Sequence, residues 1–135
     1  MKPLRRQRDG GQATAFTVVM TVAILALAGL VLDAGLAVST KVEAVSAAQS
    51  AARAGARELD VAALRTTGVV RIDPVRARTA AQGWLGRARL TGTVTVTGNQ
   101  VTVSVTTARQ TQLLHMFGVA SIPVTATATA TAVVP

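Results

Sequence analysis

Hydrophobic positions predict a membrane-spanning helix near the start of the chain. From Gly10 to Leu32 the sequence carries no charged residue, and residues 13–32 are dominated by Ala, Val, Leu, Ile and Met. Twenty such residues in a helix span about 30 Å, which is the thickness of the hydrocarbon core of a bilayer. The uninterrupted apolar run therefore predicts a transmembrane helix over residues 12–32.

The helical pattern continues beyond this run. No proline occurs from Asp33 to Asp60, and alanine, the strongest helix former, recurs throughout. We expect residues 33–60 to form an Ala-rich stalk that prolongs the membrane helix as one rod. Small residues at spacings of three and four form a row along it, which we call the alanine row: Ala44, Ala47, Ala48, Ala51, Ala52, Gly55 and Ala56. Such a row permits close approach, either by a partner helix or by the chain's own Ala/Thr strand.

A second, shorter helix is predicted after a loop at residues 65–68. Asp73 followed by Pro74 is typical of an N-cap and the first helical residue. The apolar positions that follow recur at helical spacing and form one stripe, made of Ala77, Ala80, Ala81, Trp84, Leu85 and Ala88. This stripe indicates a helix that packs on the rest of the domain.

The period then changes to two, which predicts a small antiparallel sheet. Residues 93–97 and 100–106 alternate Val with Thr or Ser, and Gly98-Asn99 between them fits a tight hairpin turn. This register pairs Val96 with Val101 and Val94 with Val103, so that the valines share one face.

The last third of the chain contains one more turn and one more predicted strand. Residues 111–117 resemble an apolar helical turn that ends at Gly118, and residues 124–132 alternate Ala with Thr. The alternation favours a third strand with a flat alanine face, and a Thr-rich disordered tail is the alternative. The predicted fold class is therefore α+β: a long transmembrane-plus-stalk helix, a second short helix and a small antiparallel sheet.

Composition argues against an enzyme. The chain has no cysteine, one histidine (His115) and no carboxylate side chain after Asp73, which leaves little material for acid–base or metal chemistry. We expect no cofactor, no metal site and no small-molecule substrate. Fourteen basic against six acidic residues give a net charge of +8, but the arginines are scattered and aromatic residues are too few for a base-stacking platform. We therefore expect no nucleic-acid partner either.

The charge distribution instead indicates an orientation in a membrane. Lys2, Arg5, Arg6 and Arg8 precede the apolar run, against Asp9 alone. By the positive-inside rule, residues 1–11 form a cytoplasmic flank and residues 61–135 a small extracytoplasmic domain of a single-pass protein. Membrane lipid is then a partner, and Asp33 is the polar residue at the membrane exit.

Two alternatives to the membrane anchor remain open at this stage. One is a cleaved signal peptide, with small-residue sites at Ala26-Leu27-Ala28 and near residues 34–37. Cleavage there would release a secreted basic protein that binds anionic envelope polymers. The other alternative is a helix buried inside a soluble protein.

The layout of residues 8–60 resembles a known family. A basic flank, Gly11 at the membrane entry, one apolar span, Asp33-Ala34-Gly35 and an Ala-rich stalk are similar to the TadE/TadG-like proteins of the tight-adherence (Flp) pilus apparatus. The resemblance implies a short, minor pseudopilin or envelope component that helps to assemble a secreted fibre. Its implied partners are other pilus-assembly or pseudopilin proteins.

The chain departs from type IV-like pilins at the processing site. Those proteins are cut after a glycine by a membrane prepilin peptidase, and they carry glutamate five residues beyond the cut. If Gly11 precedes the cut, Gln12 becomes the first residue and Phe16 takes the place of that glutamate. We therefore expect cleavage at Gly11–Gln12 to be inefficient or absent.

Overall fold

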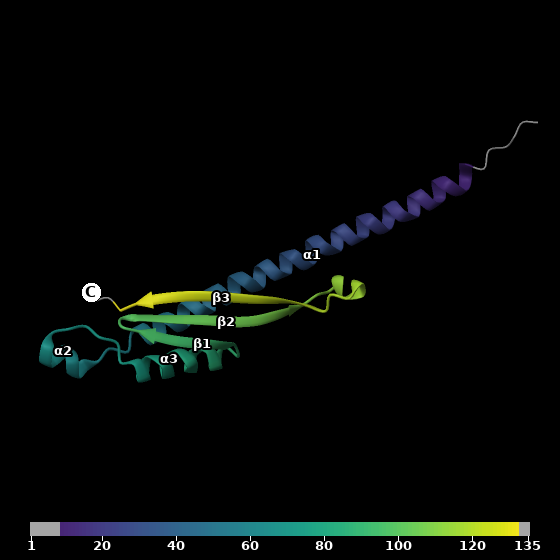
Figure 1. The fold of residues 1–135 in the computed structure, drawn as a ribbon. Coiled ribbons are helices and arrows are strands. Elements are labelled where there is room, and N and C mark those ends of the chain that lie inside the picture. Colours follow the sequence, from purple (N-terminus) through teal and green to yellow (C-terminus); the bar gives the residue numbers. More distant parts are fainter. Residues whose placement is uncertain (1–8, 133–135) are drawn as a thin grey trace, which may run out of the picture.

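The computed structural model describes residues 9–132, and it has the α+β fold that the sequence predicts. Figure 1 shows a long helix that runs out of a small sheet domain. In chain order the elements are α1 (Asp9–Ala56), α2 (Val61–Thr67), α3 (Pro74–Arg87), β1 (Thr91–Thr97), β2 (Gln100–Gln110), the 3-10 turn η1 (Leu114–Phe117) and β3 (Ser121–Thr131). The basic residues of the expected cytoplasmic flank, Lys2 to Arg8, lie outside the described residues.

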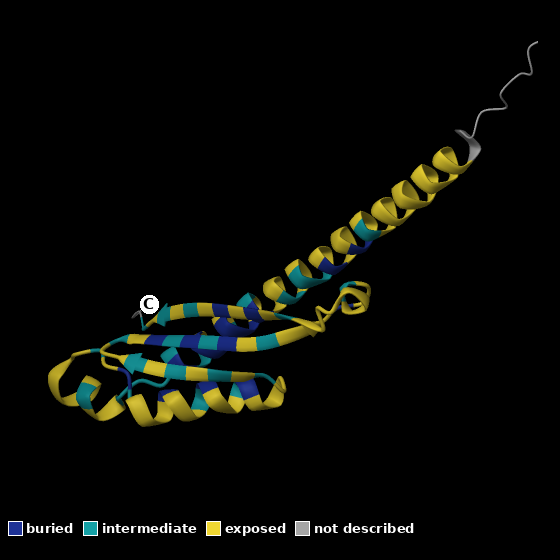
Figure 2. Cartoon of the chain, turned by 45° about the vertical axis from the view of Figure 1, so that its right-hand side comes forward, coloured by how far each residue is buried: buried dark blue, intermediate teal, exposed yellow. Residues whose placement is uncertain are grey.

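Helix α1 is continuous over 48 residues, which corresponds to about 72 Å at the rise of an α-helix. Residues 11–32, which we call the free part of α1, are exposed except at Ala26 and Gly29, whereas the C-terminal part of the helix lies behind the sheet (Figure 2). The threonine hydroxyls of the exposed part are satisfied within the helix, because Thr17 and Thr21 donate to the carbonyls of Ala13 and Thr17, each at 2.8 Å. The helix ends at Ala56, short of the expected residue 60.

The sheet has the order β1-β2-β3 and is antiparallel throughout. The predicted register of the hairpin is confirmed, since Val94 pairs with Val103 and Val96 with Val101. Gly98 turns the chain with a positive φ of 57°, a conformation that suits glycine. Residues 121–131 form the third strand, so the disordered alternative is wrong for this segment.

Both α1 and α3 cover the same face of the sheet, and the opposite face is lined by hydroxyl side chains. Valines of β2 are fully buried beneath the helices, together with Ile72, Ala77, Ala81 and Leu85. On the outer face, Thr102 bonds Thr129 at 2.9 Å and Ser104 bonds Thr127 at 3.0 Å. The domain therefore has two layers and one apolar core.

The segment between α1 and α3 differs from the sequence prediction. Residues 65–68 were expected to form a loop, but most of them belong to the short helix α2. Asp60 starts this helix by accepting a hydrogen bond from the Ala63 N–H at 3.0 Å, and Gly68 ends it in the left-handed conformation. The two capping residues define a helix that is too short for apolar periodicity to reveal.

The connection from β2 to β3 returns along α1. It contains η1, which begins at Leu114 and ends at Gly118 with a positive φ of 90°, as the sequence predicts. Figure 1 shows this connection beyond the end of the sheet, on the side toward the free part of α1. We call residues 111–119 the β2–β3 loop.

Candidate functional site

The most specific polar contact in the described chain joins Asp33 to the β2–β3 loop. Asp33 lies on α1 at the expected membrane exit, and only 2% of its surface is exposed. Its carboxylate accepts hydrogen bonds from three consecutive backbone N–H groups, those of Gln112 at 2.8 Å, Leu113 at 3.1 Å and Leu114 at 2.8 Å. One side chain thereby fixes the whole start of the η1 turn on the long helix.

This arrangement favours the ionised form of Asp33. Hydrogen bonds that a carboxylate accepts from backbone N–H groups stabilise its negative charge. The bond from Leu114, with those from Gln112 and Leu113, lowers the pKa of the Asp33 carboxyl below its ordinary value, although desolvation acts in the opposite direction. Asp33 is therefore a charged cap for the turn and needs no basic side chain as partner.

Gly29, one helical turn before Asp33, lets the loop approach α1 closely. A Cβ atom at this position would lie 3.1 Å from the Cβ atom of Leu113. Between helix and loop lies a groove of about 340 Å³ with apolar walls, lined by Val22, Leu25, Ala26, Gly29, Leu113, Leu114, Met116 and Phe117. Gly29 and Asp33 thus lie on the same face of α1, and both contact the β2–β3 loop.

The base of the loop is closed independently of α1. Thr111 is buried, its N–H donates to the Ala120 carbonyl at 3.1 Å, and its hydroxyl donates to the Val119 carbonyl. Beyond the loop, α1 itself is tied to the sheet, because Lys41, two helical turns after Asp33, donates to the Thr125 carbonyl of β3. Because both ends of the loop are held, its central turn has a defined position beside α1.

The alanine row faces the interior of the domain. Ala44, Ala48, Ala51 and Ala52 belong to the core cluster that includes residues of the sheet and α3, and Ala47 is buried as well. Gly55 shows why small residues are needed, since a Cβ there would lie 2.9 Å from the Ala77 carbonyl oxygen. Of the two alternatives for this row, the packing of its buried residues is on the chain's own domain, and Ala56 at its end is half-buried.

The three residues of the expected processing site lie at the opposite end of α1. Gly11, Gln12 and Phe16 are all exposed, and 66% of the Phe16 surface is free. They lie on the free part of the helix, remote from Asp33 and from the sheet (Figure 1). The structure therefore separates these residues from the Asp33 contact and does not join them into one site.

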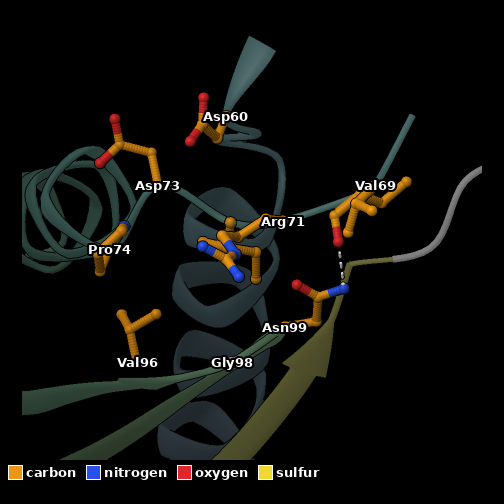
Figure 3. Close-up of a pocket in the computed structure, with 10 residues that line it drawn as sticks. Asp60, Val69, Arg71, Asp73, Pro74, Val96, Gly98 and Asn99 are labelled. Atoms are coloured by element: carbon orange, nitrogen blue, oxygen red, sulfur yellow. Dashed lines mark hydrogen bonds between the residues drawn. The ribbon is translucent and has the colours of Figure 1, made fainter. Parts of the chain in front are cut away.

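A cleft of about 810 Å³ with both polar and apolar walls lies at the other end of the domain, where Arg71 lies among Asp73, Pro74 and the hairpin turn at Gly98-Asn99 (Figure 3). Its two carboxylates are engaged as helix caps: Asp60 accepts from Ala63, and Asp73 accepts from the N–H groups of Val75 and Arg76. Asn99 donates to the Val70 carbonyl at 2.8 Å. Within residues 9–132 no group of three or more His, Asp or Glu side chains is placed to hold a metal ion. Asp60, Asp73 and Asn99 thus serve the local fold.

Sequence reasoning identified Asp33 but missed its partners. The sequence predicts only a polar residue at the membrane exit. The structure shows that its acceptor capacity is used by the loop. The available signal was the pair Gly29 and Asp33, four residues apart on one face of an otherwise apolar stretch of helix.

Residues 11–58 match the model of a family described as putative Flp pilus-assembly TadE/G-like. No curated protein and no solved structure matches the chain. The matched segment contains the free part of α1, Asp33 and the alanine row, whereas the sheet and the β2–β3 loop lie outside it. Within the described residues, α1 is also the one helix that is long and apolar enough to cross a membrane. Residues 11–58 are thus similar to the TadE/G-like Flp pilus-assembly family, which agrees with the resemblance found in the sequence.

Proposed function

We propose that the chain is a membrane-anchored, minor pseudopilin-like component that assists the assembly of a Flp/Tad-type pilus or secretion apparatus. The observation that carries this proposal is the division of the matched segment into two parts. The C-terminal part of the matched segment packs against the chain's own sheet, whereas its apolar N-terminal part is exposed. An exposed apolar helix of this length needs lipid or other membrane helices around it.

The proposed orientation places the N-terminus in the cytoplasm and the sheet domain outside. It rests on the basic flank before the apolar run and on the positive-inside rule. Residues 12–32 then cross the bilayer, and Asp33 lies at the outer surface together with the start of the β2–β3 loop. The domain is thereby held close to the membrane and not at the end of a flexible tether.

Contacts with other pilus-assembly proteins are proposed to run through the free part of α1. Helices associate in lipid by close packing and polar contacts, since lipid removes the hydrophobic drive between them. The alanine row is not available for this purpose because it is buried. Val19 and Val31, which are 66% and 71% exposed, represent the surface that remains.

Release by signal cleavage is the less favoured alternative. A cut near residues 34–37 would separate Asp33 from the domain and remove all three hydrogen bonds that it accepts from the loop. The contact has a role in a chain that keeps its membrane helix. A secreted basic binding protein released by a cut near residues 34–37 is therefore disfavoured, whereas a cut after Ala28 would leave Asp33 and its hydrogen bonds in the released chain.

Photo-crosslinking in the host cell tests the proposal. A photoreactive amino acid is placed at Val19 or Val31, with Val75 on α3 as the matched control, because Val75 is 69% exposed but belongs to the sheet domain. We expect Val19 and Val31 to give adducts with other pilus-assembly proteins, identified by mass spectrometry. Adducts that form at Val75 alone, or no protein adduct at either helix position, would contradict the proposal.

A further inference from the structure

We propose that the β2–β3 loop is a second membrane contact, which inserts beside α1 into the outer leaflet and places Leu113, Met116, Phe117 and Val119 among the lipid acyl chains. This inference rests on the membrane anchor but not on the role in pilus assembly. The partner is lipid, recognised through apolar burial and not through a headgroup.

The depth of the loop follows from its contacts with α1. Leu113 lies against Gly29, and the groove between loop and helix extends along α1 to Val22. Both helix residues belong to the apolar run that spans the bilayer. At the rise of an α-helix, Gly29 lies about 5 Å and Val22 about 15 Å below the end of the run at Leu32. Segments that lie in the interface typically bury their apolar face about 5–10 Å deep.

The side chains of the loop are suited to lipid. Residues 111–119 contain no Asp, Glu, Lys or Arg. Met116 and Phe117 are 75% and 68% exposed, and Val119 and Leu113 are 42% and 38% exposed. Large apolar side chains gathered on one exposed turn are unusual where only water surrounds them. The exposed apolar surface of the loop therefore continues that of the membrane helix.

The backbone of the loop is also prepared for an apolar environment. Within hydrocarbon, each N–H group requires an internal partner, because water is absent. The N–H groups of Gln112, Leu113 and Leu114 donate to Asp33. The N–H groups of residues 111, 116, 118 and 119 donate to carbonyls inside or beside the loop, each at 3.1 Å. The Asp33 contact thus satisfies three N–H groups that would otherwise oppose insertion of this turn, and the exposed polar side chains of the loop are those of Gln112 and His115.

Another membrane helix seated in the groove would also cover these residues. The observations favour lipid, because the loop lies against a helix that is itself surrounded by lipid and needs no additional protein to reach it. Lipid is the occupant that a single copy of the chain meets as soon as α1 is inserted.

Fluorescence quenching in vesicles tests the inference. The chain has no cysteine, so single-cysteine variants carry one environment-sensitive probe each. Met116→Cys and Phe117→Cys report on the loop. Val19→Cys reports on the anchor, and Thr95→Cys reports on an exposed position of β1. The full chain is reconstituted in vesicles of phosphatidylcholine and phosphatidylglycerol, and quenching by nitroxide-labelled lipid is compared with quenching by aqueous iodide.

We expect the probes at Met116 and Phe117 to be quenched by lipid nitroxide several-fold more than the Thr95 probe, and to be protected from iodide. The inference would be overturned if lipid quenches the Val19 probe but the loop probes behave like the Thr95 probe. In that case a protein partner would cover the apolar side chains of the loop. A Val19 probe that lipid does not quench would remove the anchor on which the inference depends. The first result leaves the proposed role in pilus assembly intact, whereas the second would also remove the membrane anchor that this role requires. The crosslinking experiment tests the contacts with pilus-assembly proteins separately.

Discussion

The carboxylate of Asp33 accepts a hydrogen bond of 2.8 Å from the backbone N–H of Leu114, a residue 81 positions away in the sequence. This bond joins the middle of α1 to the turn that connects β2 with β3. It fixes the sheet domain at the level where the apolar run of α1 ends. With α1 anchored in a membrane as proposed, this tertiary contact sets the position of the domain relative to the bilayer together with the helix.

Replacing Asp33 with Ala is expected to release the β2–β3 loop from α1 without unfolding the sheet. The N–H groups of residues 112–114 lose their acceptor, whereas the valine core of β2 is unchanged. Hydrogen exchange should show loss of protection at these amides and retained protection in β2. Glu43→Ala is the matched control, since Glu43 is an exposed carboxylate on the same helix. Equal protection of residues 112–114 in wild type and Asp33→Ala would refute the role of the carboxylate.

Acidification is expected to have the same effect as this substitution. The backbone hydrogen bond from Leu114, together with those from Gln112 and Leu113, lowers the pKa of Asp33 from its ordinary value of 3.8. A lowered pKa in the folded state means that the contact contributes its full stability above pH 3.8 and loses it as the pH falls through the folded value. The emission of a probe at Met116 should therefore change below pH 3.8 in the wild type. The same change in Asp33→Asn, which has no carboxyl to protonate at this position, would show that Asp33 is not the group responsible.

The sequence predicts those parts of the fold that local periodicity determines. The hairpin register followed from the Val/Thr alternation around Gly98-Asn99, and the start of α3 followed from Asp73 and Pro74. The partners of Asp33 could not be predicted, because the loop that supplies them is distant in sequence and binds through its backbone. The alanine row left two alternatives open, since small residues permit close packing with a partner and with the chain's own sheet alike.

Enlarging the alanine row is expected to destabilise the domain. Ala48 and Ala52 have no exposed surface, so Ala48→Leu and Ala52→Leu each force extra volume into a packed core and should lower the free energy of unfolding by about 1–3 kcal/mol. Val42→Leu, at a position that is 63% exposed on the same helix, should change it by less than about 0.5 kcal/mol. Chemical unfolding of the full chain in detergent provides the measurement. Leucine variants as stable as wild type would show that the row does not pack as described.

Processing at Gly11–Gln12 is expected to be inefficient because Phe16 offers no carboxylate to the amino group that cleavage would create. A buried charge in a membrane is tolerable only with such a partner. Mass spectrometry of the membrane-fraction protein should find the peptide that spans this bond intact. Phe16→Glu should increase the fraction that begins at Gln12. Quantitative recovery of wild-type protein beginning at Gln12 would contradict the prediction.

The central claim is that α1 crosses the membrane once and leaves the sheet domain outside. A pair of reporters fused after Pro135 tests it most directly, one active only outside the cytoplasm and one active only within it. We expect activity of the outside reporter alone, in cells where the chain remains in the membrane fraction. Activity of the cytoplasmic reporter at the same position would contradict the orientation, and with it the proposed positions of Asp33 and the β2–β3 loop at the outer surface.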